Sequence, residues 1–219
     1  MLTTAEYVAS IRRDAGAVLA LAREHADRLV PWCPGWTVQS VADHLDAAIR
    51  GPLSRSSTFA PATEGLAAVL AALAAAAVDV ELDHVRGAAQ ECGIHRWDAE
   101  AAVNGLTAAP AIDEQLACDG IDEFFESAMV GQLEWRKVRA GEGQRLHFHR
   151  TDGPGEWLIV LDEHPVVTHE HVDTARGGAD VELSGPVSEL LLWLWNRVPP
   201  PEVIGDTDVL DHLRSVSQH

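Results

Sequence analysis

The chain has 219 residues, which suits one large domain or two small ones and is enough for a substantial buried core. It carries 16 Lys and Arg against 34 Asp and Glu, a formal net charge of -18. A surface of this sign repels phosphate groups, so we expect neither a nucleic-acid partner nor attachment to an anionic membrane.

The N-terminal stretch and the cysteines bear on the cellular compartment. "MLTTAEYVASIRRDAG" is polar and lacks the apolar core of a signal peptide, and no apolar run in the chain reaches the length of a membrane span. The three cysteines, Cys33, Cys92 and Cys118, are odd in number and have no CxxC spacing. We therefore expect a reduced, cytoplasmic protein.

The first two thirds of the chain have the periodicity of helices. Apolar residues recur at helical spacing over 3–29 and 38–50, and "VPWCPGWT" separates the two segments before Thr37, a predicted helix cap. The alanine-rich "EGLAAVLAALAAAA" is helical by propensity. Two further helices are predicted over 82–104 and 113–138.

After "RAGEGQ" the apolar period changes from 3.6 to 2. "RLHFHRTD" and "EWLIVLD" flank "GPG", which indicates a β-hairpin, and "PVVTHEHV" and "ADVELSG" are typical of two further strands. Pro186 then opens an apolar helix, "VSELLLWLWNRV", and a short helix is predicted from about Asp206.

Helices followed by a small mixed unit predict an α+β fold with two domains. We expect a helix bundle over 1–142 and a small α/β domain over 143–219. Gly141 and Gly143 are expected in an exposed linker between them.

Three residues on two predicted helices are candidate metal ligands. His44 lies at the edge of the apolar stripe of 38–50, and Glu91 and His95 are one helical turn apart on 82–104. If the helices pack together, two imidazoles and a carboxylate meet inside a bundle. This donor set suits a divalent ion such as Zn²⁺ and leaves a coordination position open. The alternative is a polar edge of a core helix.

Three residues near the candidate ligands could be structural or could support the site. Asp98, three residues after His95, could accept the second ring N–H of His95 or could be a solvated surface residue. Cys92 falls on the apolar face and is expected in the core, and Cys33 is expected to pack in a turn.

Two histidine pairs occur in the predicted sheet. "HFH" and "HEH" place His147 with His149, and His169 with His171, each on one face of a strand. Two such pairs on adjacent strands could bind a metal, or they could form the polar face of a half-covered sheet.

Five blocks of the sequence resemble the actinobacterial mycothiol-dependent maleylpyruvate isomerase family of DinB-like metalloenzymes. They cover most of the chain in order: "VPWCPGWTVQSVADHL", "HRWDAEAAV", "DGIDEFFE", "LHFHRTDGPGEWLIVLD" and "GPVSELLLWLWNRVP". The resemblance implies a DinB-like four-helix bundle followed by a small α/β domain similar to a sterol-carrier fold. It also implies a metal triad of His44, Glu91 and His95, the residues that helical spacing selects.

The resemblance further implies a chemistry. Mycothiol is the implied thiol cosubstrate, and metal coordination makes its thiolate available near neutral pH. Addition to an electrophilic small molecule would give cis–trans isomerisation of a maleylpyruvate type, or thiol S-transfer. Arg197 is expected to hold the carboxylate of the substrate, and its alternative role is to cap the preceding helix.

Two other functions remain open at this point. A metal-dependent hydrolase would use metal-activated water in place of a thiol, and a non-catalytic protein would use the open position only to hold a ligand. The segment "LAAAAVDVELDHVRGAAQECG" has a much shorter loop before its helix than similar sequences have. The identity of the thiol and of the substrate is therefore left open.

Overall fold

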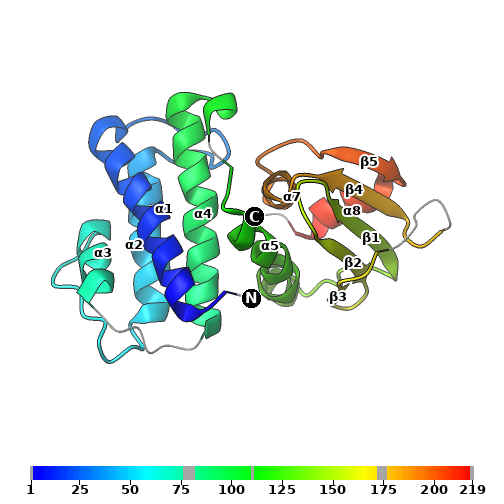
Figure 1. Cartoon of the computed structure of the whole chain (residues 1–219), viewed down its shortest axis with the longest axis horizontal. Coiled ribbons are helices and arrows are strands. Elements are labelled where there is room, and N and C mark those ends of the chain that lie inside the picture. Colours follow the sequence, from blue (N-terminus) through cyan, green and yellow to red (C-terminus); the bar gives the residue numbers. More distant parts are fainter. Residues whose placement is uncertain (1, 76–81, 110, 172–176, 218–219) are drawn as a thin grey trace. The chain divides into compact units, whose positions relative to one another are not determined.

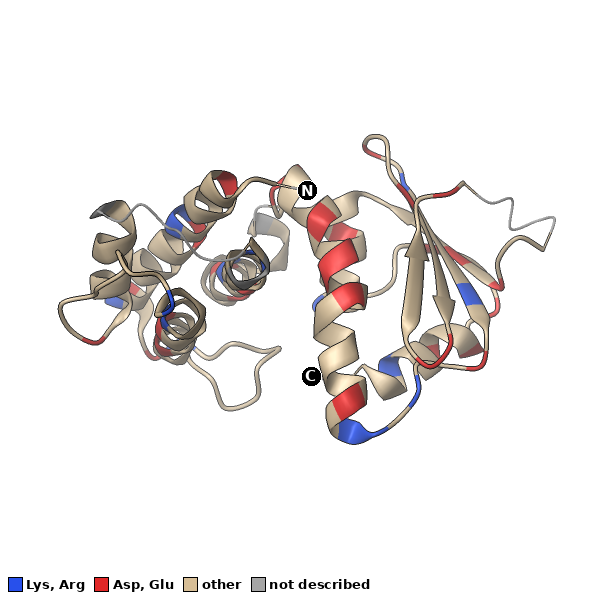
Figure 2. Cartoon of the chain, turned by 90° about the horizontal axis from the view of Figure 1, so that it is seen from below, with Lys and Arg blue, Asp and Glu red and all other residues tan. Residues whose placement is uncertain are grey.

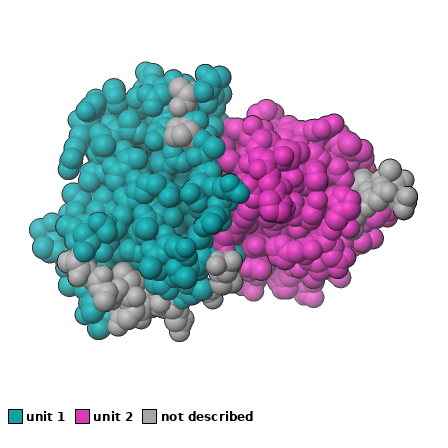
Figure 3. All heavy atoms as spheres, in the orientation of Figure 1, with its two compact units in different colours: residues 1–116 teal, residues 117–219 magenta. Residues whose placement is uncertain are grey.

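The computed structural model describes residues 2–75, 82–109, 111–171 and 177–217, and its fold is α+β, as the sequence predicts. The chain divides into two compact units, Met1–Leu116 and Ala117–His219 (Figure 3). Acidic residues are spread over the elements of both units (Figure 2). Among the described residues, no helix is both long and apolar enough to cross a membrane.

The N-terminal unit is built from helices (Figure 1). Its main helices are α1 (Thr4–His25), α2 (Val38–Leu53), α3 (Leu66–Ala75) and α4 (Leu82–Asn104), followed by a short 3₁₀ turn, Leu106–Ala108. Helices α1, α2 and α4 pack against one another, and α3 lies against α1 and α2. The predicted helix over 82–104 is confirmed, and the one predicted over 38–50 continues to Leu53.

The starts of α1 and α2 are fixed by capping boxes. Thr3 accepts a hydrogen bond from the backbone N–H of Glu6, and Thr37 accepts one from Ser40. Each capping residue thus satisfies a backbone donor that the helix itself leaves unpaired. The shortened loop discussed above falls partly on 76–81, outside the described residues.

The C-terminal unit combines helices with a five-stranded sheet (Figure 1). Its strands are β1 (Gln144–Arg150), β2 (Glu156–Leu161), β3 (Pro165–Thr168), β4 (Val181–Gly185) and β5 (Glu202–Gly205), in the order β3-β2-β1-β4-β5. Its helices are α5 (Glu114–Glu123), a π turn (Phe124–Ala128), α6 (Met129–Arg136), α7 (Val187–Leu194) and α8 (Asp208–Val216). Strand β1 pairs antiparallel with β2 and parallel with β4.

The two faces of this sheet differ in chemistry. Phe148 of β1 makes edge contacts with the rings of Phe125 and Trp193, whose centroids lie 6.0 and 5.9 Å away. Helices therefore pack on the face that carries Phe148. Because successive strand residues point to opposite faces, His147 and Glu156 lie on the other face.

The boundary between the units lies at 116/117, earlier than the expected 142/143. Helices α5 and α6 belong with the sheet since Trp157 Nε1 donates to Asp122 at 3.0 Å and Arg136 donates to the carbonyl of Val216 at 3.0 Å. Gly141 is buried, and its N–H donates to the carbonyl of Asp162 at 2.8 Å. The expectation that Gly141 lies in an exposed linker is therefore wrong.

Two strands depart from the sequence-based assignment. Strand β3 covers only "PVVT" of the predicted "PVVTHEHV". Strand β5 was not predicted, because it directly follows a run of three prolines that indicates a break. As an edge strand pairing only with β4, β5 tolerates this neighbourhood.

Candidate metal centre

Helices α2 and α4 bring His44, Glu91 and His95 together. His44 Nε2 lies 3.0 Å from Glu91 Oε2, and His95 Nε2 lies 3.3 Å from the same oxygen. One ligating atom from each residue lies within 4.8 Å of the other two. The structure thus places both ring nitrogens around a single carboxylate.

The apolar packing of the two helices produces this arrangement. Val41 and Leu45 flank His44 in the sequence and are fully buried, so His44 is held at the edge of the α2 core face with 35% of its side chain exposed. On α4, Cys92 is fully buried beside Glu91, and burial raises the pKa of its thiol. Cys92 is therefore a core residue, as expected, because its thiolate is disfavoured there.

Asp98 fixes the orientation of His95. His95 Nδ1 donates to Asp98 Oδ2 at 2.9 Å, and Asp98 is fully buried. Because Nδ1–H is engaged by Asp98, Nε2 is the ring nitrogen beside Glu91 that is left to bind a metal once it is deprotonated. This is the arrangement of a metal-binding histidine whose outer nitrogen is held by a carboxylate.

Cys33 also contacts this group. Its Sγ donates to Asp98 Oδ2 at 3.7 Å, so Cys33, His95 and Asp98 form a second cluster of ligating atoms. That cluster shares His95 with the first, and its carboxylate is fully buried. The cluster with His44 and Glu91, each 35% exposed, is the one that a substrate can reach.

The charges of the site are linked. Burial raises the pKa of Glu91, but hydrogen bonds with His44 and His95 outweigh burial and hold this pKa well below its usual range. Burial lowers the pKa of His95, but hydrogen bonds to Asp98, Cys33 and Glu91 outweigh it and raise this pKa. Glu91 is therefore ionised, and metal binding at His95 would release a proton.

The three residues fit a tetrahedral metal. Two ligand atoms that are each about 2.0–2.1 Å from such an ion are about 3.3 Å apart. The nitrogen–oxygen distances of 3.0 and 3.3 Å agree with this spacing. Two imidazoles and one carboxylate are also a donor set that Zn²⁺ accepts while keeping one position for another ligand.

Trp36 is a site residue that sequence reasoning missed. Its ring centroid lies 5.0 Å from that of His44 and 5.7 Å from that of His95, with which it stacks. The turn before α2 holds it, since Trp36 N–H donates to Cys33 O at 2.9 Å and Gly35 has a φ of 83°. The "PGW" triplet immediately before a capped helix was the available signal.

Arg197 lies in the C-terminal unit, just after α7. Its Nη1 donates to the carbonyl of Trp195, the residue that caps the C-terminus of α7. This contact is the one expected of a cation at a helix end. The role of Arg197 toward a substrate stays a prediction.

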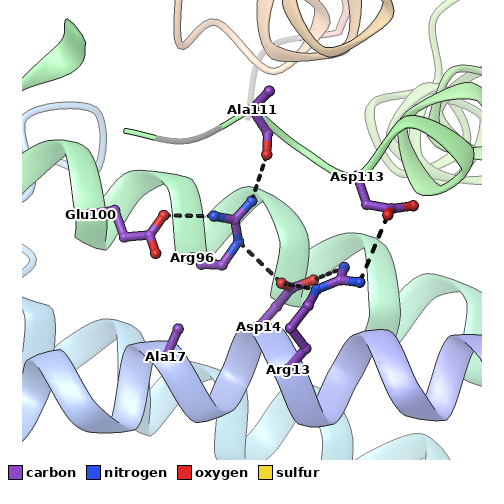
Figure 4. Close-up of a pocket in the computed structure, with 7 residues that line it drawn as sticks. All are labelled: Arg13, Asp14, Ala17, Arg96, Glu100, Ala111 and Asp113. Carbon is purple, nitrogen blue, oxygen red and sulfur yellow. Dashed lines mark hydrogen bonds and ion pairs between the residues drawn. The ribbon is translucent and has the colours of Figure 1, made fainter. Parts of the chain in front are cut away.

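A pocket of about 350 Å³ in the N-terminal unit contains none of the three candidate ligands (Figure 4). Its two cations are already neutralised. Asp14 accepts hydrogen bonds from Arg13 at 2.8 and 2.9 Å and lies 3.1 Å from Arg96 Nε, while Arg96 donates to Glu100 at 2.6 Å. We interpret this network as a brace between α1 and α4, because no cation in it is left to bind an anion.

Comparison with known protein families identifies the C-terminal part of the chain. Residues 115–212 match the model described as the MDMPI C-terminal domain. The match begins close to the start of the second compact unit. None of the curated proteins matches the chain.

Proposed function

We propose that the chain is a mycothiol-dependent metalloenzyme, because residues 115–212 match the model described as the MDMPI C-terminal domain, which supports the maleylpyruvate isomerase family. In this proposal His44, Glu91 and His95 hold a divalent metal, most simply zinc. In this proposal a thiolate adds to an electrophilic small molecule. Rotation about the resulting single bond and elimination of the thiol would give cis–trans isomerisation of a maleylpyruvate type, whereas retention of the new C–S bond would be S-transfer.

The convergence of the three candidate ligands supports this proposal most strongly. They come from two helices, and their ligating atoms lie within 4.8 Å of one another. When bound, a divalent metal would lower the pKa of a coordinated thiol, so that the thiolate is present near neutral pH. A site with three protein ligands keeps a position open for that thiol.

The chain's own residues would orient and shield the reaction. Asp98 holds the proton on His95 Nδ1, which keeps the ring in one orientation. The ring of Trp36 lies against both imidazoles and would limit the directions from which water can approach them. We assign Arg197 to the carboxylate of the substrate, because a guanidinium pairs with both oxygens of such a group.

Metal analysis tests the ligand assignment. His44→Ala or His95→Ala should lower the zinc content of the purified full chain by about one ion per chain relative to the wild type, while the helical circular dichroism is kept. His25→Ala removes an exposed histidine from the last turn of α1 and serves as the matched control. Retention of this metal in both ligand variants would disprove the assignment.

Cobalt substitution tests the role of the thiol. Addition of mycothiol to the cobalt protein should produce a sulfur-to-metal charge-transfer band, and the band should be absent from His95→Ala. Product analysis with and without mycothiol then identifies the reaction. If the protein turns over a substrate with water alone and mycothiol leaves the cobalt spectrum unchanged, it is a hydrolase. Ligand affinity without turnover would indicate a binding protein.

A further inference from the structure

We propose a second metal site, on the sheet of the C-terminal unit, in which His147, Glu156 and His171 bind a divalent transition-metal ion. The three residues come from β1, from β2 and from the segment that follows β3. One ligating atom of each lies within 4.8 Å of the other two. The site belongs to a different unit from His44, Glu91 and His95, and it does not depend on the function proposed for them.

A single carboxylate lies at the centre of the cluster. Glu156 Oε2 is 2.7 Å from His147 Nε2, and Glu156 Oε1 is 3.2 Å from His171 Nδ1. His149 Nδ1 lies 2.7 Å from Glu156 Oε1 as well. Strand pairing explains this proximity, since His149 and Glu156 are opposite each other in the β1–β2 register, and His147 shares their face.

His147 is held between two carboxylates. Its side chain is fully buried, and its second nitrogen, Nδ1, lies 3.0 Å from Glu182 Oε2. A neutral imidazole has only one N–H, so it can donate to one of the two carboxylates but not to both. If Nδ1–H donates to Glu182, the lone pair of Nε2 is left facing Glu156, and a cation between these two atoms would satisfy both.

The position of Glu182 is itself supported. Ser184 Oγ donates to Glu182 Oε1 at 3.0 Å, which holds the carboxylate against His147. In many metal sites, a carboxylate accepts a hydrogen bond from the ring nitrogen of the histidine that does not bind the metal. This contact fixes the tautomer and the orientation of the ring. On the alternative of a merely polar sheet face, His147 would have to be an imidazolium that donates to both carboxylates; in the proposal, the metal ion takes the place of the proton on Nε2.

Charge and donor type identify the class of ion. The carboxylates of Glu156 and Glu182 supply negative charge that a divalent cation can balance. Imidazole nitrogen favours zinc, cobalt, nickel or copper over magnesium and calcium, which prefer oxygen ligands. His171 is 69% exposed, so the ion can enter from solvent through this ligand.

His169 defines the limit of the site. It lies near Asp122, with His169 Nε2 3.4 Å from Asp122 Oδ1, and its ring is 6.3 Å from that of Trp157. Trp157 and Glu156 are adjacent in β2 and point to opposite faces of the sheet. The "HEH" pair is therefore split between the two faces, and only His171 joins the cluster.

Calorimetric zinc titration of the chelator-treated full chain tests the proposal. The parent protein for this test is His44→Ala/His95→Ala, which removes two ligands of the first site. We expect this parent to bind about one zinc and to gain thermal stability from it. Adding His171→Ala should weaken zinc binding by more than about 100-fold. Loss of a residue that only hydrogen-bonds to a ligand weakens binding by about 10–100-fold, so a larger loss indicates that His171 binds the ion directly. Circular dichroism should be unchanged, because His171 is exposed.

Adding His169→Ala to the same parent is the matched control, since His169 is also exposed and is two residues away. This variant should bind zinc as tightly as the parent does. Neither the parent nor this variant should bind magnesium. The proposal is overturned if the parent takes up no zinc, or if His171→Ala binds it as tightly as His169→Ala. Because the first site is already disabled, either outcome leaves the proposed catalytic function unaffected.

Discussion

Two histidine–glutamate clusters have the same arrangement of side chains on different secondary structure. We call His44, Glu91 and His95 the helical cluster, and His147, Glu156 and His171 the sheet cluster. In the N-terminal unit, His95 is fixed at Nδ1 by Asp98 and directs Nε2 toward Glu91. In the C-terminal unit, His147 is fixed at Nδ1 by Glu182 and directs Nε2 toward Glu156. Each cluster thus has a buried imidazole with a carboxylate behind it, an arrangement that is common for metal-binding histidines.

The clusters differ in what surrounds the remaining ligand. His44 is 35% exposed and lies under the ring of Trp36, whereas His171 is 69% exposed. A partly shielded site can exclude water and still admit a small molecule, which suits catalysis. A site with a solvent-exposed ligand outside the strands suits a structural ion, which stabilises the fold by binding residues from three segments at once. Under the two proposals, we therefore expect catalysis at the helical cluster and stabilisation at the sheet cluster.

Arg197→Ala tests this division of roles with the largest expected effect on turnover. Loss of one charge-assisted contact to a substrate carboxylate, about 1.5–3 kcal/mol, should lower kcat/KM for mycothiol and an unsaturated carboxylate about ten- to 150-fold. Metal content should stay unchanged at both clusters. Steady-state kinetics and metal analysis of the same preparation measure the two quantities.

Arg139→Ala is the control for Arg197→Ala. Arg139 belongs to the same unit, is exposed and pairs with Asp162, so its loss should leave kcat/KM near that of the wild type. If the two arginine variants behave alike, Arg197 acts only at the end of α7 and does not contact the substrate.

Removing the carboxylate behind each buried imidazole tests whether the two clusters share one design. Asp98→Asn and Glu182→Gln keep the size of the side chain but remove its charge, and each should weaken zinc at its own cluster by about 10–100-fold. Each should leave the other cluster unchanged. Calorimetric titration of the two variants, each beside the wild type, gives both affinities, and an unchanged affinity in Glu182→Gln would break the analogy.

The two clusters also differ in how far the sequence predicts them. His44, Glu91 and His95 can be selected from helical spacing, because one helix turn brings residues four apart together and the apolar stripe gives the packing face. Glu156 and Glu182 could not be selected in this way. Their approach to His147 depends on strand register and on the parallel β1–β4 pairing, which no local pattern specifies.

Other differences have similar physical causes. Trp36 reaches the imidazoles through a turn, and the turn's path is fixed by tertiary contacts as well as by Gly35. The expected boundary lies later than that of the compact units because α5 and α6 are ordinary helices in sequence, and long-range contacts such as those of Trp157 and Arg136 group them with the C-terminal unit. Local chemistry therefore predicted the elements, and long-range pairing determined the rest.

Thr37→Ala tests the coupling between the scaffold and the helical cluster, with the smallest expected effect. Thr37 caps α2 and directly follows Trp36, so loss of its hydrogen bond to Ser40 N–H should lower the free energy of unfolding by about 0.5–2 kcal/mol. The start of α2 and the turn holding Trp36 should loosen together. Zinc affinity at the helical cluster should then fall by at most about five-fold, the equivalent of about 1 kcal/mol.

Thr3→Ala is the matched control, because Thr3 caps α1 with the same type of capping box and α1 carries no candidate ligand. Chemical denaturation should give a similar loss of stability in both variants, while zinc affinity should fall only in Thr37→Ala. The sheet cluster should bind zinc equally in both. Equal affinities at the helical cluster in the two variants would mean that helix packing alone positions His44, since the capped turn and Trp36 would then contribute nothing to the metal site.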